Sequence, residues 1–158
     1  MAVQIKSAIT QRRQNGVMTV VSGKLTVRSE GPKGGTDIVN ITQGVIEQLR
    51  ASGLTDGTIT LFVTHTTAGI AVIEDERGHK LDQANFWERI IPTRDGYQHN
   101  AIAGDHNGHS HLRAGIQGQS VVIPFSEGKL ALGTYQRIFL LEFDAPRERT
   151  VIAQIMGV

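Results

Sequence analysis

The chain has 158 residues, of which 39% are hydrophobic and 20% are charged, with a formal net charge of +1 and no cysteine. This length suits a single domain over residues 1–158 with a core of its own. The small net charge favours neither nucleic acid nor an anionic membrane as a partner, and the lack of cysteine excludes disulfides and thiolate ligands. No segment is long and apolar enough to span a bilayer, so the expected location is the cytoplasm.

Alternating and β-branched residues predict extended segments near the start of the chain. We expect an edge strand over Val3–Ile9 and a second strand over Val17–Val27, with Ser22 and Gly23 as a turn or bulge inside it. The glycine and proline content of Glu30–Asp37 predicts a loop.

A helix is predicted over Thr42–Ser52, because its apolar residues form one stripe and Gly53 can end it in a left-handed conformation. Asn40 or Thr42 can cap its start. A strand over Thr58–Thr64 follows and delivers His65 to the end of an apolar segment.

A second helix is expected from near Glu76 to Ile91, with a buried face made of Leu81, Ala84, Trp87 or alternatively Phe86, Ile90 and Ile91. Residues 92–108 read as a long polar loop, which is often functional. Further strands are expected over Gly118–Phe125, Leu130–Leu132, Tyr135–Phe143 and Arg149–Met156. Two helices among about seven strands, mostly joined by hairpins, predict the α+β class.

The densest chemistry lies between Gly104 and Leu112, which contains His106, His109 and His111. In an extended backbone, His109 and His111 project to the same side with Cβ atoms roughly 7 Å apart, so both rings can reach one ion. On an α-helix the same pair would diverge by about 200°. A metal site therefore requires an extended backbone here, and the alternative is a polar loop with hydrogen-bonded histidines.

His65 is the natural third ligand, and three imidazoles with an open fourth position are typical of a catalytic zinc site. The alternative for His65 is a buried ring whose nitrogens are satisfied by neighbours. Glu74 can be a fourth ligand, a general base or an orienting group, and equally a solvated carboxylate at a strand end. Asp105 can orient an imidazole or cap a turn.

Other polar residues suit an anionic substrate group such as phosphate. Thr66 and Thr67 offer hydroxyls, while Gln136 and Arg147 offer further donors. His106 is a candidate substrate contact beside the metal-site histidines. Ordinary turn chemistry is the alternative for these residues. No Gly-x-x-x-x-Gly-Lys, Gly-x-Gly-x-x-Gly or Gly-x-Ser-x-Gly motif is present, which argues against nucleotide hydrolysis, dinucleotide redox chemistry and serine hydrolysis.

Several ordered segments together resemble the YjbQ-like family, often called secondary thiamine-phosphate synthases. They are Ser52–Gly57, His65–Ile70, Asp105–Leu112, Leu130–Gln136 and Glu142–Arg147, and the resemblance covers about residues 24–157. It implies an α+β fold with a compact, mixed or antiparallel, barrel-like sheet and two main helices. It also implies a homotrimer, with a metal or anion near the His-Thr-Thr and His-x-His motifs.

The resemblance implies an enzyme that joins a pyrimidine pyrophosphate to a thiazole phosphate, as a main or a side activity. Pyrophosphate transfer usually uses Mg²⁺, whereas three histidines prefer Zn²⁺. The alternatives are a metal-dependent hydrolase of a phosphorylated substrate and a trimeric metal- or anion-binding module. The chain departs from the family pattern at Ile73, His106 and Tyr135, where the family usually has asparagine, a small residue and tryptophan.

Overall fold

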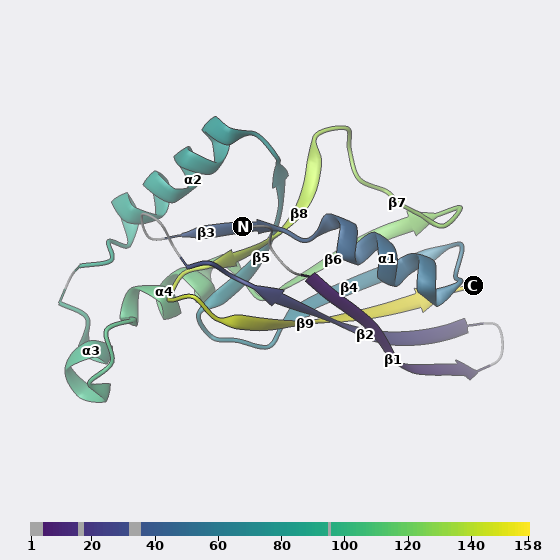
Figure 1. The fold of residues 1–158 in the computed structure, drawn as a ribbon, viewed down its shortest axis with the longest axis horizontal. Helices are drawn as coiled ribbons and strands as arrows, with labels where there is room; N and C mark the ends of the chain where they lie inside the picture. Colours follow the sequence, from purple (N-terminus) through teal and green to yellow (C-terminus); the bar gives the residue numbers. More distant parts are fainter. Residues whose placement is uncertain (1–4, 16–17, 32–35, 95) are drawn as a thin grey trace.

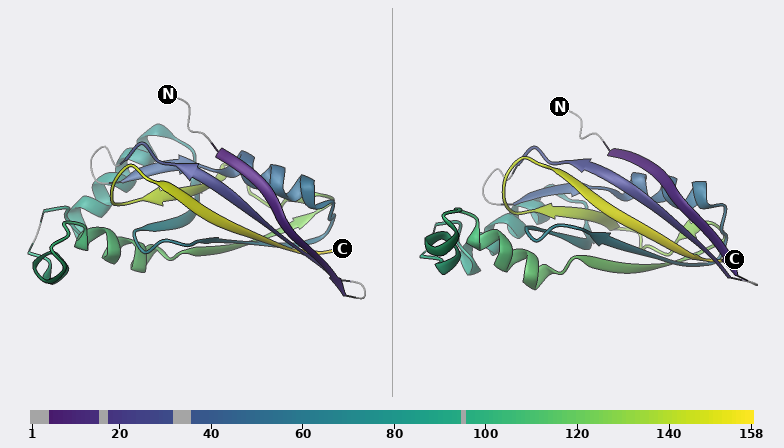
Figure 2. Two further views of the ribbon diagram at one scale, coloured as in Figure 1. Left: turned by 60° about the horizontal axis from the view of Figure 1, so that its bottom comes forward. Right: turned by 90° about the horizontal axis from the view of Figure 1, so that it is seen from below.

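Antiparallel strands form a large curved sheet in the computed structural model, which describes residues 5–15, 18–31, 36–94 and 96–158. Across the described part of this sheet the strand order is β1-β2-β9-β4-β6-β7. The strands are β1 Ile5–Asn15, β2 Met18–Arg28, β4 Gly57–Val63, β6 Ser120–Ser126, β7 Lys129–Leu130 and β9 Glu148–Gly157. Figures 1 and 2 show this sheet curling like half of a barrel.

A second, smaller sheet has the order β3-β8-β5 within the described residues. Its strands are β3 Asp37–Asn40, β5 Ala68–Glu74 and β8 Gln136–Glu142. The β5–β8 pairing is antiparallel and in register, from Ala68 opposite Glu142 to Glu74 opposite Gln136. This ladder has two ends, and the predicted site residues are divided between them.

Helix α1, Thr42–Ser52, lies against the inner face of the large sheet (Figure 2). Its buried side chains Val45 and Leu49 join the main core, in which inward-facing residues of β4 such as Ile59 and Leu61 are fully buried. Gly53 ends the helix with φ 70°, in the left-handed region where a glycine has no Cβ to clash. The helix bounds, the glycine cap and the inward face of β4 confirm the predictions.

The helices α2 Arg77–Ile90, α3 Gln98–Ala103 and α4 Gly108–Gln117 lie together at the end of the molecule away from the C-terminus (Figure 1). The side chain of Glu76 caps α2 by accepting the backbone N–H groups of Gly78 and His79, at 2.7 and 2.8 Å. The helices α3 and α4 replace the expected loop and extended segment, so that prediction is wrong.

The predicted buried face of α2 is only partly correct. Trp87 and Ile91 are buried, and Trp87 packs edge-on against Phe143 with ring centroids 5.3 Å apart. Leu81 and Ile90, in contrast, are 57% and 46% exposed. Apolar spacing alone identified the helix, but it overestimated the width of the face that the small sheet covers.

The N-terminal strands differ from the prediction in the position of the bulge. Strand β2 runs without interruption through Ser22 and Gly23, and the bulge lies in the partner strand β1, between Ile9 and Gln11. The expected strand residues Val3 and Val17 lie outside the described residues, as do residues 32–35 of the predicted loop. The α+β class with an antiparallel, half-barrel sheet is confirmed. Among the described residues, no helix has the length and apolar character needed to cross a bilayer.

Candidate functional site

His65 lies just beyond the end of β4, half-buried beside the start of β9. The backbone N–H of Thr150 donates to its Nε2 at 3.1 Å, so in the neutral ring the proton is on Nδ1. Burial lowers the pKa of His65 first, and the positive charge of Arg149 lowers it further against the opposing effect of Glu142. The neutral ring therefore offers an N–H donor at Nδ1 rather than a free lone pair.

His111, on α4, and His65, beyond β4, line the same pocket. The pocket has a volume of about 560 Å³, and its other lining residues include Phe62, Thr64, Thr66 and Gln119. The ring of His111 also lies against that of His99 on α3, with centroids 4.6 Å apart. Two imidazoles from separate elements therefore line one hollow.

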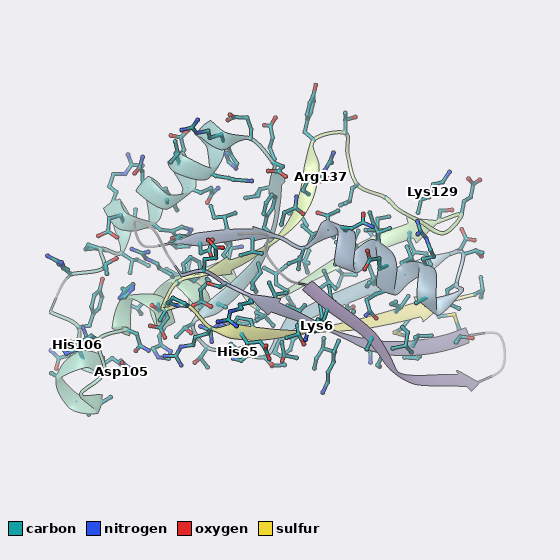
Figure 3. The ribbon with its side chains drawn as sticks, viewed as in Figure 1. Lys6, His65, Asp105, His106, Lys129 and Arg137 are labelled. Atoms are coloured by element: carbon teal, nitrogen blue, oxygen red, sulfur yellow. The ribbon has the colours of Figure 1, made fainter. Side chains whose placement is uncertain are left out.

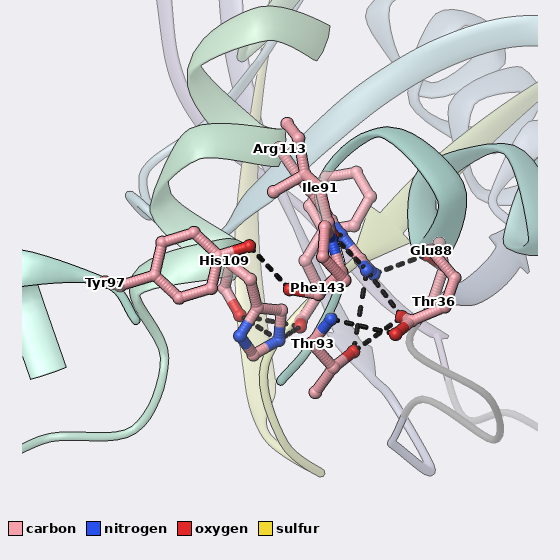
Figure 4. A network of polar contacts seen from close by, with 10 residues as sticks. Thr36, Glu88, Ile91, Thr93, Tyr97, His109, Arg113 and Phe143 are labelled. Atoms are coloured by element: carbon pink, nitrogen blue, oxygen red, sulfur yellow. Dashed lines mark hydrogen bonds and ion pairs between the residues drawn. The ribbon is translucent and has the colours of Figure 1, made fainter. Parts of the chain in front are cut away.

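His109 points the other way, into the protein, and is only 4% exposed. Its Nε2 lies 3.1 Å from the backbone oxygen of Phe143 and 3.0 Å from Oγ of Ser110, whose hydroxyl also donates to Phe143 at 2.6 Å (Figure 4). Because a carbonyl only accepts, Nε2 carries the proton, and Nδ1 is a buried lone pair without a hydrogen-bond partner among the described residues. Burial, and secondly the charge of Arg113, lower the pKa of His109.

The predicted extended backbone at 109–111 is wrong, because both residues belong to α4. Two steps along an α-helix turn side chains by about 200°, so His109 faces the core while His111 faces the pocket. The helix was hidden in the sequence because its buried face consists mainly of small or polar residues: Gly108, His109, Ser110, Arg113 and Ala114. An apolar stripe is the usual signal of a helix, and α4 lacks one.

Arg113 anchors α4 in place from a fully buried position. Its guanidinium donates to the backbone oxygen of Ile91, with Nη2 at 2.6 Å, and pairs with the carboxylate of Glu88 at 2.8 Å (Figure 4). Burial opposes the ionisation of Glu88, but hydrogen bonds from Thr93 and from Arg113 outweigh it, and the pKa of Glu88 is lowered. These contacts tie α4 to the end of α2 and hold both of its histidines in position.

A buried ion pair lies close enough to His65 for its charges to act on the ring. Arg149 pairs with Glu142 through Nε and through Nη2, the latter at 2.6 Å, and Nη2 also donates to the hydroxyl of Thr67 at 2.8 Å. All three side chains are buried. Thr67 is therefore occupied by Arg149 and is not among the pocket-lining residues, whereas the predicted anion contact Thr66 is. Arg149 and Glu142 were not predicted as neighbours of His65, and their position at the ends of apolar strands was the available signal.

Arg147 lies in the loop after β8, and it is exposed. It pairs with Asp144 at 3.0 Å, and Asp144 in turn accepts from the amide of Asn107 at 3.3 Å. Asn107 also contacts Nε2 of His99 at 3.1 Å, so a polar chain joins this loop to α3 and α4. Arg147 is thus near the site, with its charge balanced by Asp144.

Asp105 and His106 lie apart from His65, at the α3 end of the molecule (Figure 3). Both are exposed, and the carboxylate of Asp105 accepts the backbone N–H of His106 at 2.8 Å. This is the turn-capping alternative for Asp105. No contact joins either side chain to His109 among the described interactions.

Glu74 and Gln136 are at the opposite end of the β5–β8 ladder from Thr67 and Glu142. Six residue steps separate the two ends, or about 20 Å along the strands. Both side chains are exposed, and Gln136 accepts the backbone N–H of Gly133 at 2.8 Å. One chain therefore does not bring Glu74 or Gln136 to the histidine pocket.

The implied metal does not fit the donor set that one chain provides. No three His, Asp or Glu side chains in the described part of the chain are arranged to hold an ion. Nε2 of His65 already accepts a backbone N–H, so a metal at its other nitrogen would require that hydrogen bond to break or the ring to lose both protons. His109 faces away from the pocket that His111 lines. The three rings do not converge on one point.

Comparisons with known proteins place the chain among relatives of matching length. Residues 24–158 match the protein family described as UPF0047 protein YjbQ-like. A UPF0047 protein of Archaeoglobus fulgidus is 41% identical over 120 residues, covering 76% of this chain and 91% of the relative. A UPF0047 protein of Methanothermobacter thermautotrophicus is 35% identical over 140 residues, covering 89% and 94%.

Solved structures agree with the sequence relatives. The crystal structure of a YbjQ-like protein of unknown function from Sulfolobus solfataricus P2 has a TM-score of 0.83 and 36% identity, covering 89% of this chain and 99% of that one. A hypothetical protein from Aeropyrum pernix K1 has a TM-score of 0.80 and 36% identity, covering 87% and 98%. The match over residues 24–158 and the shared fold show that this chain belongs to the YjbQ-like UPF0047 family.

Proposed function

We propose that this chain is a transferase that acts on a small phosphorylated molecule in the pocket between His65 and His111. The observation that carries the proposal is that two imidazoles from separate elements line one hollow of about 560 Å³. A volume of this size is typical of small-molecule sites. The reaction to test first is the one that the family resemblance implies, the joining of a pyrimidine pyrophosphate to a thiazole phosphate.

The lining of the pocket suits such a substrate. Phe62, which is 46% exposed, offers apolar surface for a flat heterocycle, while Thr64, Thr66 and Gln119 offer polar groups for phosphate oxygens. In the proposed step, the thiazole nitrogen forms a bond to the pyrimidine methylene as the carbon–oxygen bond to pyrophosphate breaks. The Nδ1–H of His65 donates to the departing pyrophosphate, and His111 contributes a second hydrogen bond.

No part of this step passes through a metal ion, because the histidines of one chain do not form a ligand set. Zn²⁺ and Mg²⁺ are nevertheless included in the test as additives. Mg²⁺ would act on the pyrophosphate substrate, which binds it through oxygen, whereas Zn²⁺ would require imidazole ligands. Activity that requires Mg²⁺ and is not supported by Zn²⁺ would indicate a metal bound by the substrate rather than by the histidines.

The test is formation of thiamine phosphate and release of pyrophosphate by the purified chain, with each metal and with a chelator. We expect His65→Gln and His111→Ala each to lower kcat by about 100-fold or more. The matched control is His79→Gln, because His79 lies on α2 outside the pocket and its ring contacts the side chain of Gln83 on the same helix. Equal turnover in the parent chain and in both pocket variants would refute the assignment of the site.

The second candidate function is a binding module that holds an anion or a metal without turnover. The buried Nδ1 of His109 favours it. A metal-binding histidine usually donates the N–H of one ring nitrogen to a protein oxygen and binds the metal through the other, and Nε2–H of His109 donates to the backbone oxygen of Phe143. The measurement is the metal content of the purified chain and of His109→Gln. A metal retained by the parent and lost by the variant, without turnover of any phosphorylated substrate, would support the module.

We also propose that the chain forms a homotrimer through the outer face of the large sheet. Apolar side chains on this face and on the adjoining α4 are exposed: Phe62, Val122, Met156, Leu112 and Ile116. Exposed apolar surface of this kind marks contact between proteins. Phe62 also lines the histidine pocket, so a second copy would border the site.

The assembly is tested by sedimentation of the parent chain and of Val122→Lys. Val122 is 59% exposed, and a charge there is expected to shift the mass from trimer toward monomer. Ile102→Lys is the matched control, because Ile102 is 84% exposed but lies on α3 rather than on the sheet. A parent chain that sediments as a monomer at all concentrations would contradict the trimer.

A further inference from the structure

A second cavity lies on another part of the molecule, between α1 and the segment from Gly128 to Thr134. Its volume is about 730 Å³, within the range of small-molecule sites. Figure 3 shows Lys129 and Arg137, which line it, along the opposite edge of the molecule from His65. None of the lining residues belongs to the histidine pocket.

The inner lining of this cavity is apolar. Ile46, Leu49 and Leu54 come from α1 and the turn after it, and Leu130 and Leu132 face them from the other side. Leu49 and Leu54 are buried core residues, so this wall is backed by the main core. A wall of this kind favours the apolar body of a ligand over water.

Three cationic side chains also line the cavity: Arg50, Lys129 and Arg137. No aspartate or glutamate is among its lining residues, and none of the three forms a salt bridge with any described residue. Within the described part of the chain, Arg137 donates only to backbone oxygens, those of Gln136 at 2.6 Å and Thr134 at 3.1 Å. The cavity therefore carries a positive charge that the protein does not neutralise by ion pairing.

Three carboxylates on neighbouring segments have other partners. Glu47 on α1 accepts from the amide of Gln43 at 3.2 Å, and Asp56 accepts from the hydroxyl of Ser126 at 2.6 Å. Asp75 pairs with Lys80, and Arg137 is the last of the causes that lower the pKa of Asp75. Among the described residues, none of these three carboxylates forms a salt bridge with Arg50, Lys129 or Arg137, so an anion from outside the chain can complement the three cations.

We propose that this cavity binds a small amphipathic anion, one with a phosphate or carboxylate group on an apolar body. The apolar wall would hold the body, and the guanidinium and ammonium groups would hold the charged end. This site is independent of the proposed reaction at His65 and His111. Either proposal can fail while the other stands.

The binding test is calorimetry of the full chain with octyl phosphate, octanoate and octyltrimethylammonium as probes. We expect both anions to bind and the cation of the same chain length to bind at least about tenfold more weakly. The ratio of the two anions distinguishes a phosphate site from a carboxylate site. Between hexyl and octyl phosphate, affinity should rise about fourfold for each added methylene, because each is removed from water.

Charge reversal locates the site. Arg50 and Lys129 are both exposed, so their side chains can be replaced without disturbing the core. Arg50→Glu and Lys129→Glu are each expected to weaken octyl phosphate binding by about tenfold or more. Lys24→Glu on β2 is the matched control and should bind as the parent does. Ile46→Trp, which fills the cavity from α1, should abolish the dependence on chain length. Urea unfolding of each variant confirms that the fold is retained.

Three results would overturn the proposal. The first is no binding of either anion at millimolar concentration, and the second is equal binding of the cationic and anionic probes. The third is binding that Arg50→Glu and Lys129→Glu leave unchanged, because the anion would then bind elsewhere. Loss of binding in these variants with turnover at the histidine pocket retained would support two separate sites.

Discussion

The two ends of the β5–β8 ladder present a glutamate in opposite states. Glu142 ends β8, is fully buried and pairs with Arg149, whereas Glu74 ends β5 and is exposed. Both follow an apolar run, so they look alike in the sequence. The difference arises because β9 and the loop before it cover one end of the ladder. A carboxylate at a strand end therefore has no fixed role until its neighbours along the chain are placed.

The largest effect is expected from removing the charge of the buried glutamate. Glu142→Gln leaves the guanidinium of Arg149 buried without its counter-charge, which should lower the free energy of unfolding by about 3–5 kcal/mol. Urea unfolding at neutral pH measures this. Replacing both residues by methionine should recover most of the loss, because no charge is then left unpaired. A loss below about 1 kcal/mol for Glu142→Gln would contradict a tightly paired end.

A smaller effect is expected where β5 packs closely against the end of α4. A Cβ added at Gly69 would lie 2.6 Å from Cγ of Gln117 and 2.9 Å from the backbone oxygen of Gly118. Gly69→Ala should therefore cost about 1–3 kcal/mol of unfolding free energy. Gly115→Ala on α4 is the matched control, because its added Cβ would meet no described atom within 4 Å apart from its own stretch of helix, and alanine favours the helix. Equal stability of the two variants would argue against the close packing.

The histidines at the buried end should make stability depend on pH. Burial is the main cause that lowers the pKa values of His65 and His109 below 6.5 in the folded chain. As pH falls from 7, the unfolded chain takes up these protons first, so the free energy of unfolding should decrease below about pH 6.5. The carboxylates whose pKa values are lowered affect the free energy of unfolding only at more acidic pH.

Urea unfolding between pH 7 and pH 5.5 tests this dependence. His65→Gln and His109→Gln should each reduce the slope, and the double variant should reduce it further. A parent chain of constant stability over this range would show that neither ring is held neutral.

The smallest effect is expected at that exposed end. Glu74→Gln should change the free energy of unfolding by no more than about 0.5 kcal/mol, because the side chain is solvated and has no ion pair among the described residues. The same amide substitution is thus compared at the two ends of one ladder. A loss at Glu74 that matches the loss at Glu142 would remove the distinction between them. A loss of turnover at Glu74→Gln without loss of stability would return this residue to the active site.

Part of the candidate site could be predicted because the relevant signals are local. The alternation of Ile59, Leu61 and Val63 predicts that His65 lies at the end of β4, and in the structure His65 lines a pocket there together with Thr66. His111 was assigned to the same site. The proposal of three converging rings failed at His109, because a helix replaced the extended backbone.

The sequence by itself determined the elements that have a regular spacing of apolar residues or a terminating glycine, such as α1 with its Gly53 cap and the inward face of β4. Only the tertiary structure decided that α4 is a helix, since its buried face holds His109 and Arg113, which are satisfied by Phe143, Ile91 and Glu88 from distant parts of the chain. The physical reason is that a buried polar side chain depends on partners that local spacing does not reveal.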